Sequence, residues 1–246
     1  MKALQRCLYE LDNDLIVITG DITQRARKGQ FIAAKAFFES LSTSPILTVP
    51  GNHDIPLFNL LARFFWPFHN YQTYMSEQLQ PVYTSNKLWL ICLNTVQRFK
   101  HVSGQVNAEQ VEWVNRHLKV APENALKVVV AHHPFAVVLQ DDTDNLIKGA
   151  EAALQQWSQL GLNLVLGGHI HFPFAEPLNK HFTDLQGDPW VVQAGTAISK
   201  RVRNNMQNSF VRLQLGKKQC DLNIQRWDYS HEQERFIEVE RVHPWG

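Results

Sequence analysis

Four short polar segments each follow directly on an apolar run, and this pattern constrains the fold more than any other feature of the sequence. The segments are Gly20-Asp21, Gly51-Asn52-His53-Asp54, Ala131-His132-His133-Pro134 and Gly168-His169-Ile170-His171. The apolar runs before them cover residues 15–19, 46–49, 127–130 and 162–166. Such runs predict buried strands, and open α/β sheets carry their chemistry at the carboxyl ends of strands. Because Asp, Asn and His side chains bind zinc, iron and manganese, the pattern predicts an α/β metalloenzyme.

The length and composition fit one α/β domain over residues 1–246. A chain of 246 residues that is 44% hydrophobic and 19% charged can bury a sizeable core as one unit. The formal net charge of +1 gives no overall attraction to nucleic acid or to an anionic membrane, so a small substrate is expected. Cys7, Cys92 and Cys220 are widely spaced, which argues against a disulfide framework and a thiolate zinc site. No segment fits a signal peptide or a membrane span, so we expect a cytoplasmic protein with no membrane partner.

The order of the periodic segments predicts two sheets. Helices are expected at residues 3–11, 30–41, 108–118 and 145–160, with Asn107 as an N-cap and Gly161 as a stop. The helix at 30–41 lies between two predicted strands, and such a β-α-β unit implies a parallel pair. Beyond Pro177, short strands follow one another without intervening helices, which predicts a second, antiparallel sheet packed on the first. These strands are expected at residues 190–194, 210–215, 222–227 and 236–239.

The polar segments supply side chains suited to a pair of divalent cations. At a strand end, residues i and i+2 point to the same side, roughly 6 to 7 Å apart, so His169 and His171 are expected to face one cavity. Two imidazoles held in this way can bind different ions of a pair about 3.5 to 4 Å apart, the spacing that clamps phosphoryl oxygens. The Asp21 carboxylate can bridge both ions, Asn52 supplies a neutral carbonyl oxygen, and His132 completes one shell.

Two residues that follow Asn52 are candidates for catalysis. We expect His53 to face the substrate and to protonate a leaving oxygen, with Asp54 orienting the ring or stabilising its charge. His133 is followed by a proline, and we expect it to support the site without binding a metal ion.

Further candidates concern the substrate. Residues 55–76 are rich in aromatic side chains and contain two prolines, and we interpret them as a cap on the substrate side. Its rings could stack on a nucleobase, at about 1 to 3 kcal/mol per base, but ordinary packing of a large loop is the commoner explanation. Three arginines carry guanidinium groups that match phosphate oxygens, although surface solvation explains each of them equally well. They are Arg25, Arg201 and Arg203.

These blocks, in this order, resemble the calcineurin-like metallophosphoesterase superfamily, whose signature runs Asp-x-His, Gly-Asp, Gly-Asn-His-Asp/Glu, His and Gly-His-x-His. Residues 17–25, 49–56 and 193–199 are most similar to the bacterial branch that includes class III cyclic-nucleotide phosphodiesterases. The resemblance covers nearly the whole chain. It implies a four-layer α/β/β/α sandwich and a two-metal hydrolase in which Asp21 bridges the ions. It also implies that Asn52, His132 and His169 complete one shell and that His171 serves the other ion.

The Asp-x-His block of that signature is absent, because the earliest histidine in the chain is His53. On the family pattern one ion keeps all its protein ligands, whereas the other keeps only Asp21 and His171. One well-formed site is therefore expected in this chain. The sequence begins where the helix after the family's first strand begins, so we expect that N-terminal strand to be missing, either by truncation or by genuine loss. A sheet edge left uncovered in this way predicts a homodimer or aggregation.

The sequence thus predicts metal-dependent hydrolysis of phosphoesters by a phosphodiesterase that uses manganese, iron or zinc. We expect a small nucleotide-type substrate, such as a cyclic nucleotide, attacked in line by metal-bound hydroxide while His53 assists the leaving oxygen. Two alternatives stay open. One is a non-catalytic or severely impaired binding or scaffold protein that lacks one metal site. The other is a nuclease acting on DNA ends, which the near-neutral charge disfavours.

Overall fold

The largest sheet has six strands, in the order β3-β4-β5-β6-β8-β7. The structure is a computed structural model that describes residues 1–246 except residues 42–43, 101, 204–205 and 219–220. The strands are β3 (Val82–Thr84), β4 (Leu88–Cys92), β5 (Leu126–Val130), β6 (Leu164–Gly167), β7 (Phe174–Pro177) and β8 (Trp190–Gln193). The four inner strands run parallel, and the two edge strands pair antiparallel to their neighbours. The parallel strands place their carboxyl ends at one edge of the sheet.

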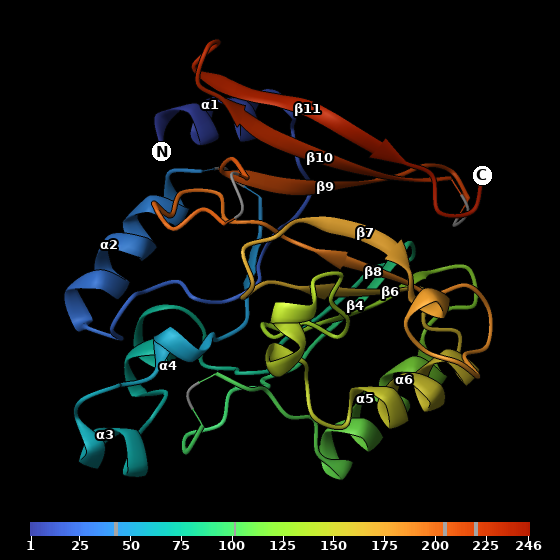
Figure 1. Ribbon diagram of the computed structural model, residues 1–246, viewed down its shortest axis with the longest axis horizontal. Helices are drawn as coiled ribbons and strands as arrows, with labels where there is room; N and C mark the ends of the chain where they lie inside the picture. Colours follow the sequence, from blue (N-terminus) through green and yellow to red (C-terminus); the bar gives the residue numbers. More distant parts are fainter. Residues whose placement is uncertain (42–43, 101, 204–205, 219–220) are drawn as a thin grey trace.

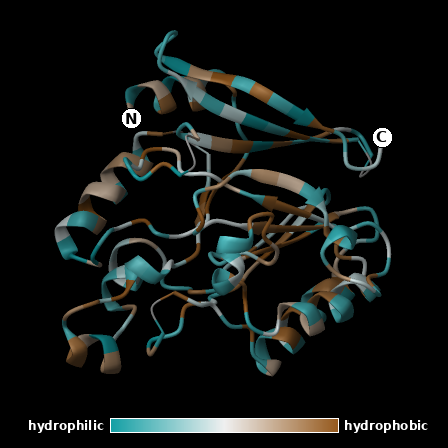
Figure 2. Ribbon diagram, viewed as in Figure 1, coloured by the Kyte–Doolittle hydropathy of each residue, from teal (hydrophilic) through white to brown (hydrophobic). Residues whose placement is uncertain are grey.

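Two smaller sheets pack against this sheet (Figure 1). One is the parallel pair β1 (Ile16–Ile18) and β2 (Ile46–Thr48), as the sequence predicts. The other is the antiparallel sheet of β9 (Ser209–Leu215), β10 (Leu222–Ser230) and β11 (Arg235–Val242). Alternate residues of β5 fill the core between the sheets, namely Leu126, Val128 and Val130, which is the period of two that a strand imposes. Figure 2 shows these inner strands as hydrophobic.

Helices cover both outer faces. On the large sheet, α5 (Ala108–Val120) and α6 (Ala150–Gln159) enclose a core that includes Val129 and Trp157. On the other side, α1 (Lys2–Glu10) and α2 (Lys28–Glu39) pack against the smaller sheets. The four-layer α/β/β/α sandwich expected from the sequence is therefore confirmed. In the described part of the chain, no helix is both long and apolar enough to cross a membrane.

Two expected elements differ from the structure. The strand expected at 190–194 belongs to the large sheet, where β8 pairs in parallel with β6, because Val191 and Val192 are buried on opposite faces of that sheet. The helix expected from residue 145 begins at Ala150 instead. The residues before it form a 3₁₀ turn, Gln140–Asn145, and an extended stretch in which Lys148 pairs with Gly104 and Val106.

The aromatic segment 55–76 contains two short helices, α3 (Leu60–Phe65) and α4 (His69–Tyr74). Tyr71 is fully buried and packs edge-on against Phe31, with the ring centroids 6.4 Å apart. Ordinary packing therefore explains this half of the segment, whereas the aromatic residues of α3 are exposed. A role as a substrate cap stays a prediction. Among the cysteines, Cys7 and Cys92 are free and buried, and Cys220 lies outside the described residues.

Candidate metal centre

The carboxyl ends of β1, β2, β5 and β6 meet, and each brings one of the polar segments. Their backbones approach so closely that only glycine fits at two positions. A Cβ atom on Gly51 would lie 2.9 Å from the Cα atom of Asp21. One on Gly20, which has a φ of +89°, would lie 2.5 Å from Nδ1 of His132. Glycine here is therefore a condition for bringing Asp21 and His132 together.

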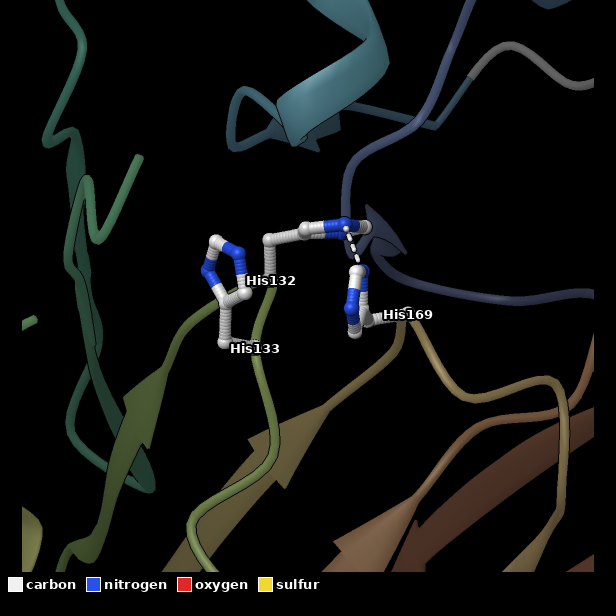
Figure 3. A group of neighbouring side chains, drawn as sticks. All are labelled: His132, His133 and His169. Carbon is white, nitrogen blue, oxygen red and sulfur yellow. Dashed lines mark hydrogen bonds between the residues drawn. The ribbon is translucent and has the colours of Figure 1, made fainter. Parts of the chain in front are cut away.

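Three of the predicted ligands, Asn52, His169 and Asp21, converge on the Nε2 atom of a fourth, His132. This nitrogen lies 3.0 Å from Oδ1 of Asn52 and 3.1 Å from Nδ1 of His169. It also lies 3.3 Å from Oδ1 of Asp21. Figure 3 shows the rings of His132 and His169 pointing toward each other. The structure thus brings together two nitrogen and two oxygen atoms from segments as far apart in the chain as residues 21 and 169.

The hydrogen bonds on the far sides of both rings fix which nitrogen carries the proton. The Nδ1 atom of His132 lies 2.7 Å from the carbonyl oxygen of Thr19, which can only accept, so Nδ1 donates and Nε2 keeps its lone pair. The Nε2 atom of His169 likewise donates to Oδ1 of Asn145 at 3.0 Å, which leaves the lone pair on Nδ1. In the neutral rings, the two lone pairs therefore face each other.

The orientation of Asn145 is fixed in turn by a buried ion pair. Its Nδ2 atom donates to Oδ1 of Asp142 at 3.2 Å, so its oxygen must face His169. Asp142 is fully buried and pairs with the guanidinium group of Arg203. A chain of contacts thus runs from Arg203 through Asp142 and Asn145 to His169. Outer partners of this kind orient the imidazole ligands of metal ions.

The charge state of the cluster also suits a metal ion. Burial, reinforced by His132, lowers the pKa of His169 to about 3, so this ring is neutral. Burial acts to raise the pKa of Asp21, but His132 and the backbone N–H of His53 hold that pKa below its usual value. A carboxylate, an amide oxygen and imidazole nitrogens with free lone pairs are the donors that a divalent cation requires. The residues therefore fit a zinc, iron or manganese ion.

His133 lies beside this cluster. Its ring is buried, its Nδ1 atom is 2.8 Å from Oγ1 of Thr95, and burial lowers its pKa well below the usual value. The ligand atoms of His132, His133 and His169 all lie within 4.8 Å of one another, a spacing that could hold a metal ion (Figure 3). The geometry thus adds His133 to the groups near the metal position, and its supporting role stays a prediction.

His53 and Asp54 occupy different environments. The backbone N–H of His53 donates to Oδ1 of Asp21 at 3.0 Å, and its Nδ1 atom lies 3.2 Å from the carbonyl oxygen of Gln24. Asp54 is fully buried and accepts hydrogen bonds from the backbone of Gly51, Ile22 and Thr23. Burial, followed by the nearby Asp21 carboxylate, raises the pKa of Asp54 to about 7. Asp54 therefore ties the first two loops together.

His171 stands apart from the four converging ligands. Strand β6 ends at Gly167, and both His169 and His171 have a positive φ, of +71° and +56°. The strand alternation used to place both rings on one side therefore does not apply here. The Nδ1 atom of His171 donates to the carbonyl oxygen of Arg201 at 2.7 Å. His171 still contributes to the lowered pKa of His169, so the two rings interact electrostatically.

The three candidate arginines lie in different places. Arg25 is exposed, with its guanidinium carbon 5.1 Å above the ring centroid of Phe58. Arg201 is exposed and contacts His171 through its carbonyl group. Arg203 pairs with the buried Asp142. Binding of phosphate by any of them stays a prediction.

Sequence reasoning missed Asn145 and Asp142. Both lie in the polar run Gln140–Asn145, which precedes α6, and nothing in its composition marks these two residues. Asn145 contacts His169, which is 24 residues further along the chain, and Asp142 contacts Arg203, which is 61 residues further. Contacts over such separations leave no local pattern in the sequence.

Comparison with protein families gives one match over most of the chain. The family model described as calcineurin-like phosphoesterase matches residues 1–173. The 3',5'-cyclic adenosine monophosphate phosphodiesterase CpdA of Escherichia coli (strain K12) is 29% identical over 175 residues, which cover 66% of this chain. A 3',5'-cyclic-nucleotide phosphodiesterase of Nostoc sp. is 24% identical over 194 residues, which cover 77% of this chain and 66% of that protein. The match spans 56% of the length of the Escherichia coli protein.

Solved structures share the fold at low sequence identity. A purple acid phosphatase from yellow lupin superimposes with a TM-score of 0.72 and 13% identity, over 98% of this chain and 48% of the lupin chain. A dimetal phosphatase from Danio rerio superimposes with a TM-score of 0.66 and 12% identity, over 100% of this chain and 89% of the other.

Proposed function

Because the chain belongs to the calcineurin-like phosphoesterase family, we propose that it is a metal-dependent phosphodiesterase that hydrolyses a small nucleotide-type phosphoester. The observation that carries this proposal is that donor atoms of Asn52, His169 and Asp21 lie 3.0, 3.1 and 3.3 Å from Nε2 of His132. The names of the bacterial relatives support a cyclic nucleotide as the substrate. The proposed centre holds one divalent cation tightly, with His171 as the ligand available for a second.

The residues of the chain have separate tasks in the proposed reaction. A bound divalent cation supplies Lewis-acid stabilisation of the phosphoryl oxygens and makes water a better nucleophile. Asp21, Asn52, His132 and His169 would hold that cation where the β1–β2 sheet meets the large sheet. Asn145 and the carbonyl oxygen of Thr19 keep the lone pairs of the two histidines directed at it.

His53 is the proposed proton donor to the leaving oxygen. Its backbone N–H donates to Asp21, and its ring interacts electrostatically with Asp21 and His169, since it lowers the pKa of both. Because Nδ1 donates to the carbonyl oxygen of Gln24, Nε2 is the nitrogen that exchanges a proton. The imidazolium form donates the Nε2 proton to the leaving oxygen, and the ring is left neutral with a lone pair on Nε2. Asp54 positions this residue by tying the loop of Gly51 to the loop of Thr23. Arg25, Arg201 and Arg203 remain the proposed phosphate contacts.

Hydrolysis of bis-p-nitrophenyl phosphate by the purified chain in Mn²⁺ tests the proposal. We expect turnover that stops with EDTA, returns with Mn²⁺ and is lost in Asp21→Asn and His132→Ala. His231→Ala, which changes an exposed histidine of another region, is the matched control. Elemental analysis is expected to find about one tightly held ion per chain.

The same preparation separates the alternatives. A folded chain that binds the cation but gives no turnover on any phosphoester contradicts the enzyme and supports a binding or scaffold protein. Turnover on single-stranded DNA that exceeds turnover on cyclic nucleotides contradicts the small substrate and supports a nuclease. A chain that binds no divalent cation contradicts the whole assignment.

A further inference from the structure

An exposed apolar surface lies outside the metal centre. We name it the aromatic ridge, and it consists of Leu60, Leu61, Phe64, Phe65, Trp66 and Phe99. Their exposed fractions run from 48% to 75%. The ring of Phe64 lies 4.9 Å from that of Phe65 and 5.7 Å from that of Phe99, measured between centroids. The ridge is therefore one continuous patch built from α3 and the loop around Phe99, and not a set of scattered side chains.

Hydrogen bonds hold the ridge in this shape. The guanidinium group of Arg63 donates to the carbonyl oxygens of Pro56, Arg98 and Lys100 at 2.6 to 3.1 Å. Arg98 donates in return to the carbonyl oxygen of Phe64 at 3.0 Å. These contacts join two segments that are more than thirty residues apart. The apolar side chains are thus presented to solvent by a fixed backbone.

The two segments that build the ridge carry positive charge only. Residues 55–76 and 94–108 contain Arg63, Arg98 and Lys100 but no Asp or Glu. Arg25 adds a fourth cation beside Phe58, next to the ridge. The net charge of the whole chain is only +1, because acidic residues elsewhere offset this local positive charge. The net charge therefore does not reveal a local preference for an anionic partner. An apolar surface bordered by cations complements a partner whose own apolar region is bordered by anionic groups.

The shape of the ridge selects among such partners. Figure 1 shows α3 at an outer corner of the molecule, and Figure 2 shows apolar residues on it. Phe64 meets Phe65 edge-on, Trp66 lies tilted against Phe65, and Leu60 and Leu61 are exposed on the same helix. This mixed surface suits burial in an apolar environment better than the stacking of separate bases. Aromatic and leucine side chains next to Arg and Lys are the composition that enters the headgroup region of an anionic bilayer.

We propose that the aromatic ridge docks this protein on an anionic lipid surface. Leu60, Leu61, Phe65 and Trp66 enter the boundary between headgroups and acyl chains, and Arg98 and Lys100 contact the anionic headgroups. No membrane span is required. Arg25 contacts Phe58, and Gln24 contacts His53, so docking turns the His53 side of the metal centre toward the membrane. The inference is independent of the hydrolytic activity.

Vesicle cosedimentation of the full chain tests the proposal, with vesicles of phosphatidylcholine alone or mixed equally with phosphatidylglycerol. We expect binding to the mixed vesicles that weakens as salt rises. The double variant Phe65→Ser/Trp66→Ser is expected to lower the partition coefficient by about tenfold or more. Lys100→Gln is expected to lower it by about fivefold. Tyr9→Ser, which changes an exposed ring on α1, is the matched control and should bind as the parent does.

Several results overturn the proposal. The proposal is wrong if the chain does not bind the mixed vesicles, or if it binds neutral vesicles equally well. It is also wrong if the variant Phe65→Ser/Trp66→Ser binds the mixed vesicles as the parent does. Tighter binding to a single-stranded oligonucleotide than to vesicles would assign the ridge to nucleic acid. Self-association of the free protein that disappears in the double variant would assign it to a second copy of the chain. Circular dichroism of each variant establishes that a loss of binding is not a loss of fold.

Discussion

Replacing Asn145 with alanine tests whether the outer contacts of the centre orient its ligands. The substitution removes the oxygen that accepts the Nε2–H of His169 at 3.0 Å. Without that acceptor, the proton can move to Nδ1, the atom that faces His132 at 3.1 Å. A ring protonated there presents no lone pair to the cation. Loss of such an outer contact typically weakens metal binding by about 10- to 100-fold, or about 1.4 to 2.7 kcal/mol.

Competition with a fluorescent chelator measures this change directly. We expect the dissociation constants for Mn²⁺ and Zn²⁺ to rise by about 10- to 100-fold in Asn145→Ala. Asn179→Ala is the matched control, because that side chain donates to the exposed Gly187 carbonyl group away from the centre.

The reasoning fails if Asn145→Ala binds both cations within about twofold of the parent chain while remaining folded. It also fails if the affinity that Asn145→Ala loses is lost through disturbed packing. Thermal unfolding of the metal-free variants separates the two explanations. A lower melting temperature without cation, together with weaker binding, would place Asn145 in the structure of the turn Gln140–Asn145 and not in the orientation of His169.

Three further predictions concern stability. Adding Mn²⁺ to about a hundred times its dissociation constant should stabilise the fold by about 2.7 kcal/mol and raise the melting temperature by about 5 to 10 °C. Arg203→Ala removes the partner of the buried Asp142, so urea unfolding should show a loss of about 1.5 to 3 kcal/mol. Burial keeps the pKa of His169 at about 3 in the native chain. Between this value and the ordinary value of 6.5, the ring is protonated in the unfolded chain but stays neutral in the native chain. Stability of the metal-free chain should therefore fall by about 1.4 kcal/mol per pH unit for this ring as the pH drops below about 6.5 toward 3.

Each of these has a distinct contrary result. A melting temperature that does not depend on Mn²⁺ contradicts a cation bound to the native centre. An Arg203→Ala variant of unchanged stability but weaker substrate binding supports the phosphate contact that the sequence predicts for this arginine. A His169→Leu variant with the acid sensitivity of the parent shows that other groups, such as the buried His133, cause it.

Elements with strong local signals could be predicted from the sequence. Helix α5 begins after Asn107, whose side chain accepts from the backbone N–H of Gln110 at 2.9 Å, as an N-cap should. The start of α6 was predicted five residues too early, because the polar residues before it also suit a helix start. The backbone of Lys148 instead pairs with Gly104 and Val106, which keeps this stretch extended and delays the helix. Such a long-range pairing leaves no local pattern in the sequence. The position of β8 depends in the same way on its partner β6.

The converging side chains could be singled out because each follows an apolar strand. Their place at a strand end is a local property, so the sequence indicates it. The groups that orient them are not local. Asn145 reaches His169 only after the turn Gln140–Asn145 folds back, and Arg203 reaches Asp142 from another loop. The two halves of the aromatic segment differ for a similar reason. Tyr71 is buried against Phe31 of α2, whereas the rings of Phe64 and Phe65 on α3 are exposed.

The four proposed ligands come from two sheets that pack against each other. Asp21 and Asn52 follow strands of the small parallel sheet, whereas His132 and His169 follow strands of the large sheet. Asp21 and His169 both have a positive φ, which costs on the order of 1 to 3 kcal/mol each and persists only where the surroundings fix it. The apolar core between the two sheets supplies that constraint. Packing therefore holds the strained backbone at Asp21 and His169, and a cation bound by the four proposed ligands would join the β1–β2 sheet to the large sheet.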